Sequence, residues 1–364
     1  MRRGVIVLLL LLALRVSVCA ADYTAQEAEI LGADKLTTAL DAQTIDALDG
    51  VTPTSGGNFG KQLWKLVTDA LSGSSGILRG AMLTAGKVLA AALCCAFAAN
   101  VQEDGPKEPA LVAGAFAITA LCTRDFQSMI GLARQTMDEI ASFTSLLLPV
   151  MSSSLAASGG AVSAGALLAG SSLAMSVLTS LCSGLLIPLV YLYILLAAAE
   201  SAVDGGGLSK IRELCGWAVG LGTKGVCLAF TAYLTLSRLL TAPADTAAVK
   251  AAQAAFSGMV PVVGSILSDA SGSLLASAAL IRSSAGLFGM LAVLAMAIGP
   301  FLKLGAGYLA LRLAAAVCMD AICKPHAALI GNLASAMGYM LAIIASATWM
   351  SLVSASCFLK AVAA

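Results

Sequence analysis

Few residues of this chain could take part in chemistry, and five charged side chains stand in or beside long apolar stretches. They are Lys87, Asp245, Lys250, Asp269 and Arg312. An ionised side chain inside a lipid bilayer costs at least about 2.5–3.5 kcal/mol, so such residues usually mark a pathway or a helix contact. Lys87 and Arg312 are long enough to reach a membrane interface, which is the simpler interpretation for them. Asp269 is too short for that, whereas Asp245 and Lys250 could pair roughly across one helical turn.

No catalytic constellation accompanies these charges. The sequence lacks HExxH, GxSxG and Walker A motifs, and no GxGxxG stands in a strand–helix context. The single histidine, His326, follows Pro325 where an apolar run begins, and we interpret it as a helix-start or interface residue. The ten cysteines form no CxxC pair, and most lie in apolar runs, where Cys behaves as a small hydrophobe. We therefore predict no enzymatic activity, no cofactor and no metal site.

The composition indicates which elements must position the charged residues. Hydrophobic residues make up 59% of the 364 residues and charged residues 11%, and the mean hydropathy is +0.93. Soluble domains carry about 25% charged residues. No charged residue stands between Glu139 and Glu200, nor in residues 327–359. Because only lipid can accommodate that much uninterrupted apolar chain, we predict an all-α, polytopic integral membrane bundle and exclude a nucleic-acid binder.

The chain is expected to have three parts. Residues 1–21 have the form of a secretory signal peptide, with Arg2 and Arg3 before an apolar run; an uncleaved anchor or a lipoprotein is the alternative. Residues 22–75 form an acidic segment that we place outside the cytoplasm. Within it, residues 62–71 have the spacing of an amphipathic helix lying at the membrane surface. Residues 76–364 form the membrane domain.

About eight spans are expected in the membrane domain. They are 77–100, 109–124, 140–158, 161–181, 183–200, 214–238, 284–302 and 327–358. We expect residues 303–325 to form a loop. Helix pairs in membranes pack closely through small residues four positions apart, and the pair Gly216 and Gly220 has this spacing.

Residues 245–282 resemble neither a loop nor an ordinary span. Pro261 interrupts an otherwise helix-like stretch, and irregular backbone at membrane depth survives only where protein or water surrounds it. We expect a re-entrant or broken element here, or alternatively a pair of amphipathic helices on the membrane surface. The spacing of residues 149–160 is echoed in 261–272, which would suit a transporter repeat or could arise by chance.

Several stretches resemble the stage III sporulation protein AE family in order along the chain. They are Asp245 with Lys250, then Met259 to Ala270 (MVPVVGSILSDA); Leu148-Pro149-Val150 with Ala156 to Gly160; Gly299 to Leu304; and Tyr308 to Ala316. The resemblance covers residues 75–355 approximately. PVVGxxLSDA is its most specific part, and the acidic segment shares nothing recognisable with the family.

The resemblance implies a membrane component of a channel or secretion-like complex that links mother cell and forespore. It would lie in the mother-cell membrane around the forespore as a permease-like or channel-core subunit. Its partners would be the other stage III sporulation A proteins, among them an ATPase and ring-forming subunits, and stage II sporulation protein Q. A stand-alone secondary transporter and a membrane anchor for a periplasm-like ring are the alternatives. Together with the broken-helix pattern, the resemblance marks eight candidate path or assembly residues: Asp245, Lys250, Pro261, Gly264, Asp269, Pro149, Gly159 and Gly160.

Overall fold

The described part of the chain is helical and contains no strand. A computed structural model describes residues 34–48, 51–52, 59–101, 108–202, 206–259, 263–321 and 324–361. Its helices are α2 (Asp34–Thr38), α3 (Ala42–Ala47), α4 (Phe59–Gly73), α5 (Ser75–Val101), α6 (Glu108–Ala157), α7 (Ala161–Leu181), the π-helical turn η1 (Cys182–Leu186), α8 (Ile187–Ala202), α9 (Gly206–Met259), α10 (Val263–Ala321) and α11 (Lys324–Lys360). The predicted signal peptide lies outside the described residues.

Six helical segments of the described chain are long and apolar enough to cross a membrane. They are Ser75–Phe97, Val112–Ala157, Ala161–Ala202, Gly207–Ala247, Ala279–Met319 and Pro325–Lys360. This confirms the predicted all-α, polytopic membrane bundle. The expected number of about eight spans was too high, because two pairs of predicted spans are continuous in the structure.

Helix α6 joins the predicted spans 109–124 and 140–158. The polar residues between these spans are helical as well, and they are spaced so that they share one helical face. Arg134 and Asp138 are exposed, whereas Ala133, Met137 and Ile140 are buried on the opposite side. The stretch therefore stays helical, because its apolar residues keep a period of 3.6 through the polar region.

The other predicted break, at Ser183, is a π-helical turn that connects α7 to α8 without interrupting the chain of helical residues. The Ser183 hydroxyl donates to the carbonyl of Thr179 at 2.8 Å, which satisfies it within the helix. Residues 303–321 are likewise helical rather than a loop, since α10 continues to Ala321. The charges Lys303 and Arg312 therefore project from a helix.

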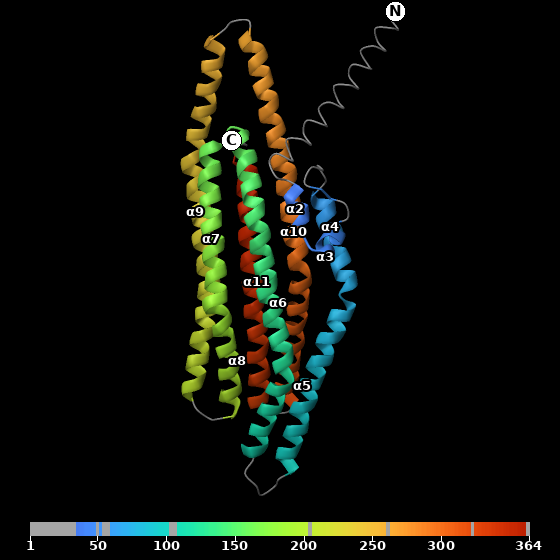
Figure 1. The fold of residues 1–364 in the computed structure, drawn as a ribbon. Helices are drawn as coiled ribbons and strands as arrows, with labels where there is room; N and C mark the ends of the chain where they lie inside the picture. The colour runs from blue at the N-terminus through green and yellow to red at the C-terminus, as the bar shows by residue number, and fades with distance from the viewer. Residues whose placement is uncertain are drawn as a thin grey trace, which may run out of the picture.

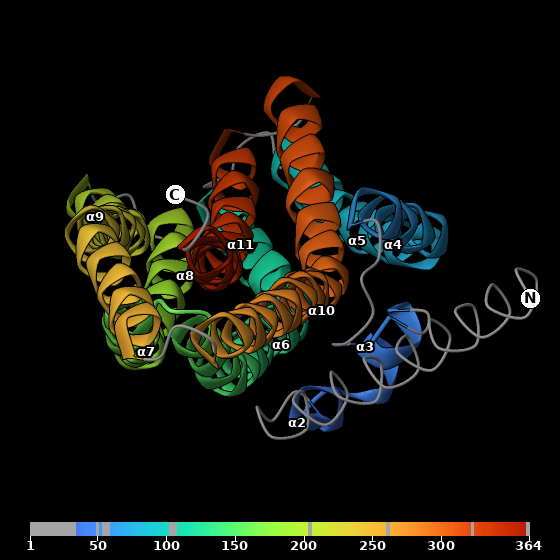
Figure 2. The ribbon, with the colours of Figure 1, turned by 90° about the horizontal axis from the view of Figure 1, so that it is seen from above.

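The long helices run alongside one another, and the start of α4 and the C-terminus lie toward the same end of the bundle (Figure 1). Seen from above, α6 and α11 lie centrally, with α7, α8 and α9 on one side and α4, α5 and α10 on the other (Figure 2). Helices α6, α10 and α11 contact one another and contribute fully buried Phe143, Phe288 and Ile343. In this core the hydroxyls of Thr144 and Ser351 lie 2.7 Å apart, so each satisfies the other.

Two short helices and one amphipathic helix precede the first long one. Helix α4 contains the amphipathic helix expected at 62–71: Leu66 is buried, whereas Trp64 is 74% exposed. Helices α2 and α3 anchor through buried Leu36 and Leu48, and the side chain of Asp41 caps α3 by accepting from the N–H of Thr44 at 3.0 Å. These elements pack on α6 and α10, so they extend the bundle laterally.

The region 245–282 forms the end of α9 and the beginning of α10, and these helices project beyond the start of α7 (Figure 1). Helix α9 ends at Met259 and α10 begins at Val263, on either side of residues outside the described part of the chain, and how this region lies relative to a membrane stays a prediction. Residue 261 lies outside the described residues. At one position of the proposed repeat the two halves differ, because Gly160 lies beside a turn whereas its sequence equivalent Gly272 lies within α10.

Candidate functional site

Three of the residues singled out from the sequence meet at the turn between α6 and α7. Gly159 adopts a φ of 96°, a left-handed conformation that other residues rarely adopt. The N–H of Gly160 donates to the carbonyl of Leu155 at 3.0 Å, and that of Gly159 donates to Ala156 at 3.1 Å. This is the Schellman arrangement, which ends α6 and satisfies its last carbonyls.

Asp245 of α9 caps the helix that follows this turn. Its carboxylate accepts from the backbone N–H of Val162 at 2.9 Å and from that of Ser163 at 3.1 Å. Gly160 at the N-cap position has no side chain to do this, so the cap comes from another helix. A buried carboxylate at a helix N-terminus is stabilised by unpaired amides and by the helix dipole. Thr241, one turn away, accepts from the Ser163 hydroxyl at 2.7 Å.

Arg282 of α10 contacts the other side of the same turn. Its Nη1 donates to the hydroxyl of Ser158 at 3.1 Å, and the residue is 7% exposed. Ser158 directly follows α6, so the guanidinium lies at the negative end of that helix dipole. The turn is therefore held by an anion from α9 and a cation from α10. Arg282 is not among the residues singled out from the sequence, because nothing in the local pattern indicates its partner.

This clamp positions helices and is poorly suited to acid–base chemistry, since both Asp245 oxygens are engaged by backbone N–H groups. The expected pairing of Asp245 with Lys250 stays a prediction. Lys250 lies in α9, and its side chain is not described; Gly264 and Asp269 lie in α10, also without described side chains. Pro149 lies exposed within α6, away from the turn.

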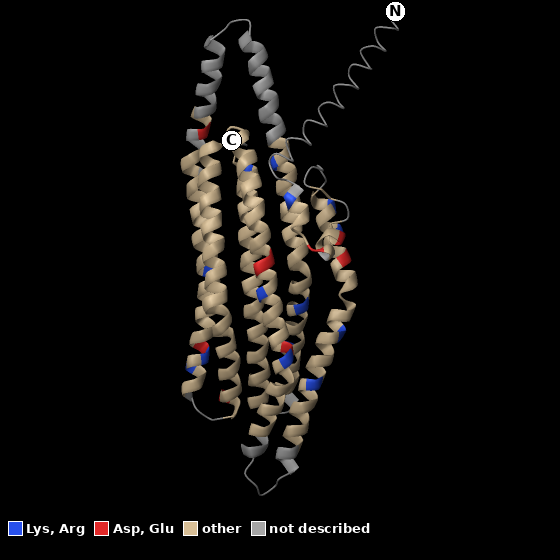
Figure 3. Cartoon of the chain, in the orientation of Figure 1, with Lys and Arg blue, Asp and Glu red and all other residues tan. Residues whose placement is uncertain are grey.

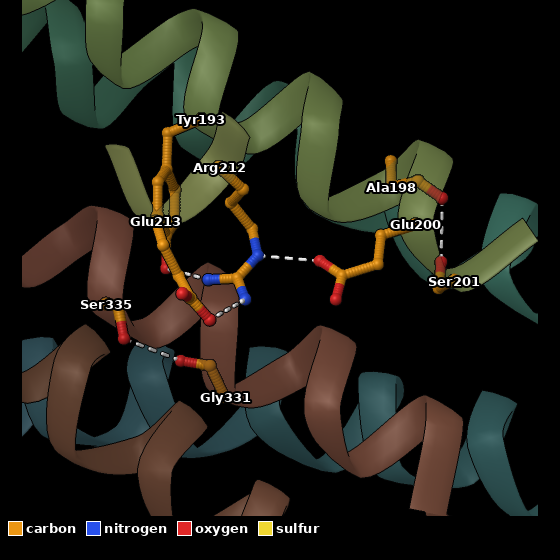
Figure 4. Close-up of polar contacts among 8 residues, drawn as sticks. All are labelled: Tyr193, Ala198, Glu200, Ser201, Arg212, Glu213, Gly331 and Ser335. Atoms are coloured by element: carbon orange, nitrogen blue, oxygen red, sulfur yellow. Dashed lines mark hydrogen bonds and ion pairs between the residues drawn. The ribbon is translucent and has the colours of Figure 1, made fainter. Parts of the chain in front are cut away.

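A second polar cluster joins α8, α9 and α11 (Figure 4). The guanidinium of Arg212 pairs with Glu200 at 2.6 Å, and its Nη1 donates to the Tyr193 hydroxyl at 3.2 Å. The Arg212 side chain is 13% exposed and also lies over the Tyr193 ring, 5.5 Å from its centroid. Glu213 approaches the same guanidinium at 3.8 Å. Arg212, which lies near the start of α9, therefore links this helix to α8.

The sequence carries a signal for this cluster, although its residues are not among the candidates singled out above. Glu200 and Arg212 stand on either side of the short connection between two apolar helices. Opposite charges at the ends of adjacent antiparallel helices are natural partners, because each would otherwise lie unpaired against apolar surface.

Tyrosine packing connects this cluster to α11. The rings of Tyr193 and Tyr339 meet edge to face, with centroids 5.2 Å apart. Gly216 of α9 makes room for Tyr339, since a Cβ at that position would lie 2.3 Å from the Tyr339 hydroxyl. A Cβ at Gly220 would meet nothing within 4 Å. Of the predicted pair Gly216 and Gly220, only Gly216 therefore permits a side chain of a neighbouring helix to approach closely.

Arg312 makes contacts within the bundle rather than only reaching toward an interface. Its Nη2 donates to the Ser335 hydroxyl of α11 at 3.1 Å, and its guanidinium lies over the Tyr308 ring at 5.6 Å from the centroid. Lys87, by contrast, is exposed on α5, and its reach to a membrane interface stays a prediction.

The most extensive polar feature is a groove between α5, α6 and α10, partly covered by α2 and α3. Three adjoining cavities form it, with volumes of about 530, 350 and 260 Å³. The first two share Asp41 and Glu139, and the second and third share Lys303. We call this feature the polar groove. Its charged lining residues are Asp41, Asp125, Arg134, Asp138, Glu139 and Lys303.

These charges lie part way along α6 and α10 rather than at their ends (Figure 3). Arg134, Asp138 and Lys303 are exposed in the groove. Gln135 donates to Glu139 at 2.8 Å, and Thr84 of α5 donates to Asp125 at 3.1 Å. All of the α6 and α10 groups belong to candidate membrane spans, where lipid contact would be costly. Wherever these parts of α6 and α10 lie within the bilayer, water or protein must border the groove.

Among the residues that the structure describes, no three His, Cys, Asp or Glu side chains are grouped so that they could hold a metal ion. His326 is buried at the start of α11 and packs against α6, where a Cβ on Gly114 would lie 2.5 Å from its Nε2. This agrees with its interpretation as a helix-start residue in a helix contact.

Comparison with known proteins relates the chain to one family. The model of the family described as Stage III sporulation protein AE matches residues 43–361. The curated Stage III sporulation protein AE of Bacillus subtilis (strain 168) is 22% identical over 216 residues, which cover 56% of this chain and 54% of the relative. The match thus spans about half the length of that relative. No solved structure matches the chain.

Proposed function

The chain belongs to the stage III sporulation protein AE family, and on that premise we propose that it is a permease-like or channel-core subunit of a complex linking mother cell and forespore. Its place would be the mother-cell membrane that surrounds the forespore. The family membership and the six apolar helices make it a membrane component of sporulation. The role in a channel is our proposal.

The observation that supports this role is the polar groove. A bundle that served only as an anchor would need no charged trough part way along its spans, because each such group costs free energy when lipid borders it. Arg134, Asp138 and Glu139 line the largest of its three cavities together with Asp41, the N-cap residue of α3. A permease or channel wall, in contrast, requires side chains of this kind to border water or a polar solute.

The remaining parts of the complex would come from partners. The sequence contains no phosphate-binding loop, so any ATP-driven step would belong to an ATPase among the other stage III sporulation A proteins. Ring-forming subunits of that set, and stage II sporulation protein Q on the opposite membrane, would complete the passage.

The test is complementation in a spore-forming bacterium that lacks the gene. Forespore gene expression after engulfment should fail in the deletion strain and return with the wild-type gene. A variant carrying Asp138→Asn and Glu139→Gln should restore it poorly, because the groove loses two of its four carboxylates. The matched control is Asp69→Asn, an exposed acid on α4 outside the groove.

Membrane levels of each variant, measured by immunoblot, separate loss of function from loss of protein. Normal sporulation in the deletion strain would contradict the proposed role. Full complementation by the doubly neutralised groove variant would contradict the assignment of that role to the groove.

A further inference from the structure

A second cavity, unrelated to the polar groove, lies between α4, α10 and α11. Its volume is about 290 Å³. Helix α10 contributes Leu294, Ala297, Ile298 and Phe301, helix α11 contributes Ala345, Thr348, Trp349 and Leu352, and α4 contributes Leu63, Leu66 and Val67. Each helix thus presents neighbours three and four positions apart, the spacing of a packing face. We call this feature the α4 cavity.

The lining of the α4 cavity offers water almost no hydrogen-bonding group. Thr348 has the only polar side-chain group among the lining residues, apart from the Trp349 indole N–H, and its hydroxyl already donates to the carbonyl of Ile344 at 2.9 Å. A buried water needs two to four polar partners, and apolar cavities of roughly 150 Å³ stay dry and take up apolar ligands. A larger apolar cavity left empty would forfeit the dispersion contacts of its whole lining.

The surroundings indicate what fills it. Two of its three walls are candidate membrane spans, Ala279–Met319 and Pro325–Lys360, and the third is the amphipathic helix α4. Trp349 is 53% exposed and Phe301 is 40% exposed, so the cavity opens at the side of the bundle between these rings. A bilayer supplies hydrocarbon chains at that side at far higher concentration than any soluble ligand.

We propose that the α4 cavity binds an acyl chain of a membrane phospholipid, which fastens α4 to the faces of α10 and α11. The chain takes the place of the side-chain packing that Ala297 and Ala345 are too small to provide. Helix α4 is then held by lipid as well as by protein, and a bilayer lipid becomes a structural part of the bundle.

Trp349 is a built-in reporter for this proposal. The Trp64→Phe, Trp217→Phe variant keeps Trp349 as its only tryptophan, and the Trp64→Phe, Trp349→Phe variant keeps Trp217, which is 62% exposed on α9 and reports ordinary surrounding lipid. Both would be placed in dioleoylphosphatidylcholine vesicles containing rising fractions of the dibrominated lipid, whose chain bromines quench fluorescence on contact. Trp349 should reach half-maximal quenching at a severalfold lower bromolipid fraction than Trp217.

A filled cavity provides the control. Ala345→Phe occupies the space, and the quenching curve of Trp349 should then move to that of Trp217, whereas Ala90→Phe on the exposed surface of α5 should leave it unchanged. Native mass spectrometry of the detergent-purified protein should show a retained phospholipid that Ala345→Phe removes. Coincident curves for the two tryptophans, or lipid retention that is insensitive to Ala345→Phe, would overturn the proposal.

Discussion

The carboxylate of Asp245 lies 2.9 Å from the backbone nitrogen of Val162, so a residue of α9 caps a helix through an amide 83 positions earlier in the chain. Arg282 completes the arrangement from α10 at the end of α6. At this one turn, the negative charge of Asp245 lies at the start of α7 and the positive charge of Arg282 lies at the end of α6. The arrangement fixes the level at which α9 and α10 extend beyond the start of α7.

The first prediction concerns this cap. Asp245→Ala should lower the free energy of unfolding by about 1–2 kcal/mol, because the first N–H groups of α7 lose their acceptor. Asp245→Asn should cost clearly less, since an amide oxygen can still accept from them. Thermal unfolding followed by helical circular dichroism in detergent would check the order. Equal stability of the Ala and Asn variants would argue against the cap.

The second prediction concerns the turn itself. Gly159→Ala should destabilise the protein by about 1–2 kcal/mol, because an alanine at a φ of 96° is strained. Gly165→Ala on the exposed face of α7 is the control, since a Cβ there meets nothing within 4 Å and alanine favours the helix. The same unfolding measurement should show opposite signs for the two variants. A neutral Gly159→Ala would mean that the turn is not held as described.

The third prediction is a double-mutant cycle between α9 and α11. Gly216→Ala should lower stability, because the new methyl group displaces the Tyr339 hydroxyl and disturbs its contact with Tyr193. Tyr339→Phe removes that hydroxyl and should rescue part of the loss. Gly220→Ala should raise stability slightly, since its Cβ meets open space and alanine favours the helix. Strictly additive effects of Gly216→Ala and Tyr339→Phe would contradict the predicted contact.

The fourth prediction concerns the ion pair. Glu200→Gln should cost about 2 kcal/mol, because Arg212 stays largely covered and loses its charged acceptor. Arg212→Lys should not restore full stability, since an ammonium cannot reach Glu200 and Tyr193 with a planar fork. Removing both charges, with Glu200→Gln and Arg212→Gln together, should cost less than the two single changes summed. A cycle with no coupling would exclude the pair as a stabilising contact.

Hydropathy alone predicts most of this fold, because long apolar runs leave helices as the only solution in lipid. It also places the amphipathic helix near Trp64 and the turn at Gly159. It misplaces the boundaries wherever polar residues share one helical face, as Arg134 and Asp138 do on α6. The high density of charged residues there suggests a loop, whereas the helical spacing of the apolar residues between them favours a helix.

The candidate sites were less accessible from the sequence. Asp245 and Gly159 were singled out separately, but their meeting depends on how α7 packs against α9, which no local pattern encodes. The polar groove combines residues from α3, α5, α6 and α10, so it exists only after the bundle has assembled. Lys303 illustrates the difficulty, since it was assigned to a loop and instead lines the middle of the groove.

The central claim is that the polar groove borders water while the protein lies in a membrane. Single cysteines introduced by Gly131→Cys and Ser142→Cys line its largest cavity, and Leu173→Cys on α7 is a control at an exposed apolar position. The measurement is the rate at which a membrane-impermeant thiol reagent labels each variant in vesicles, above the background of the native cysteines. We predict that both groove variants react at least about tenfold faster than the Leu173→Cys variant. Groove cysteines that react as slowly as the control in vesicles, yet react readily after detergent solubilisation, would contradict the account.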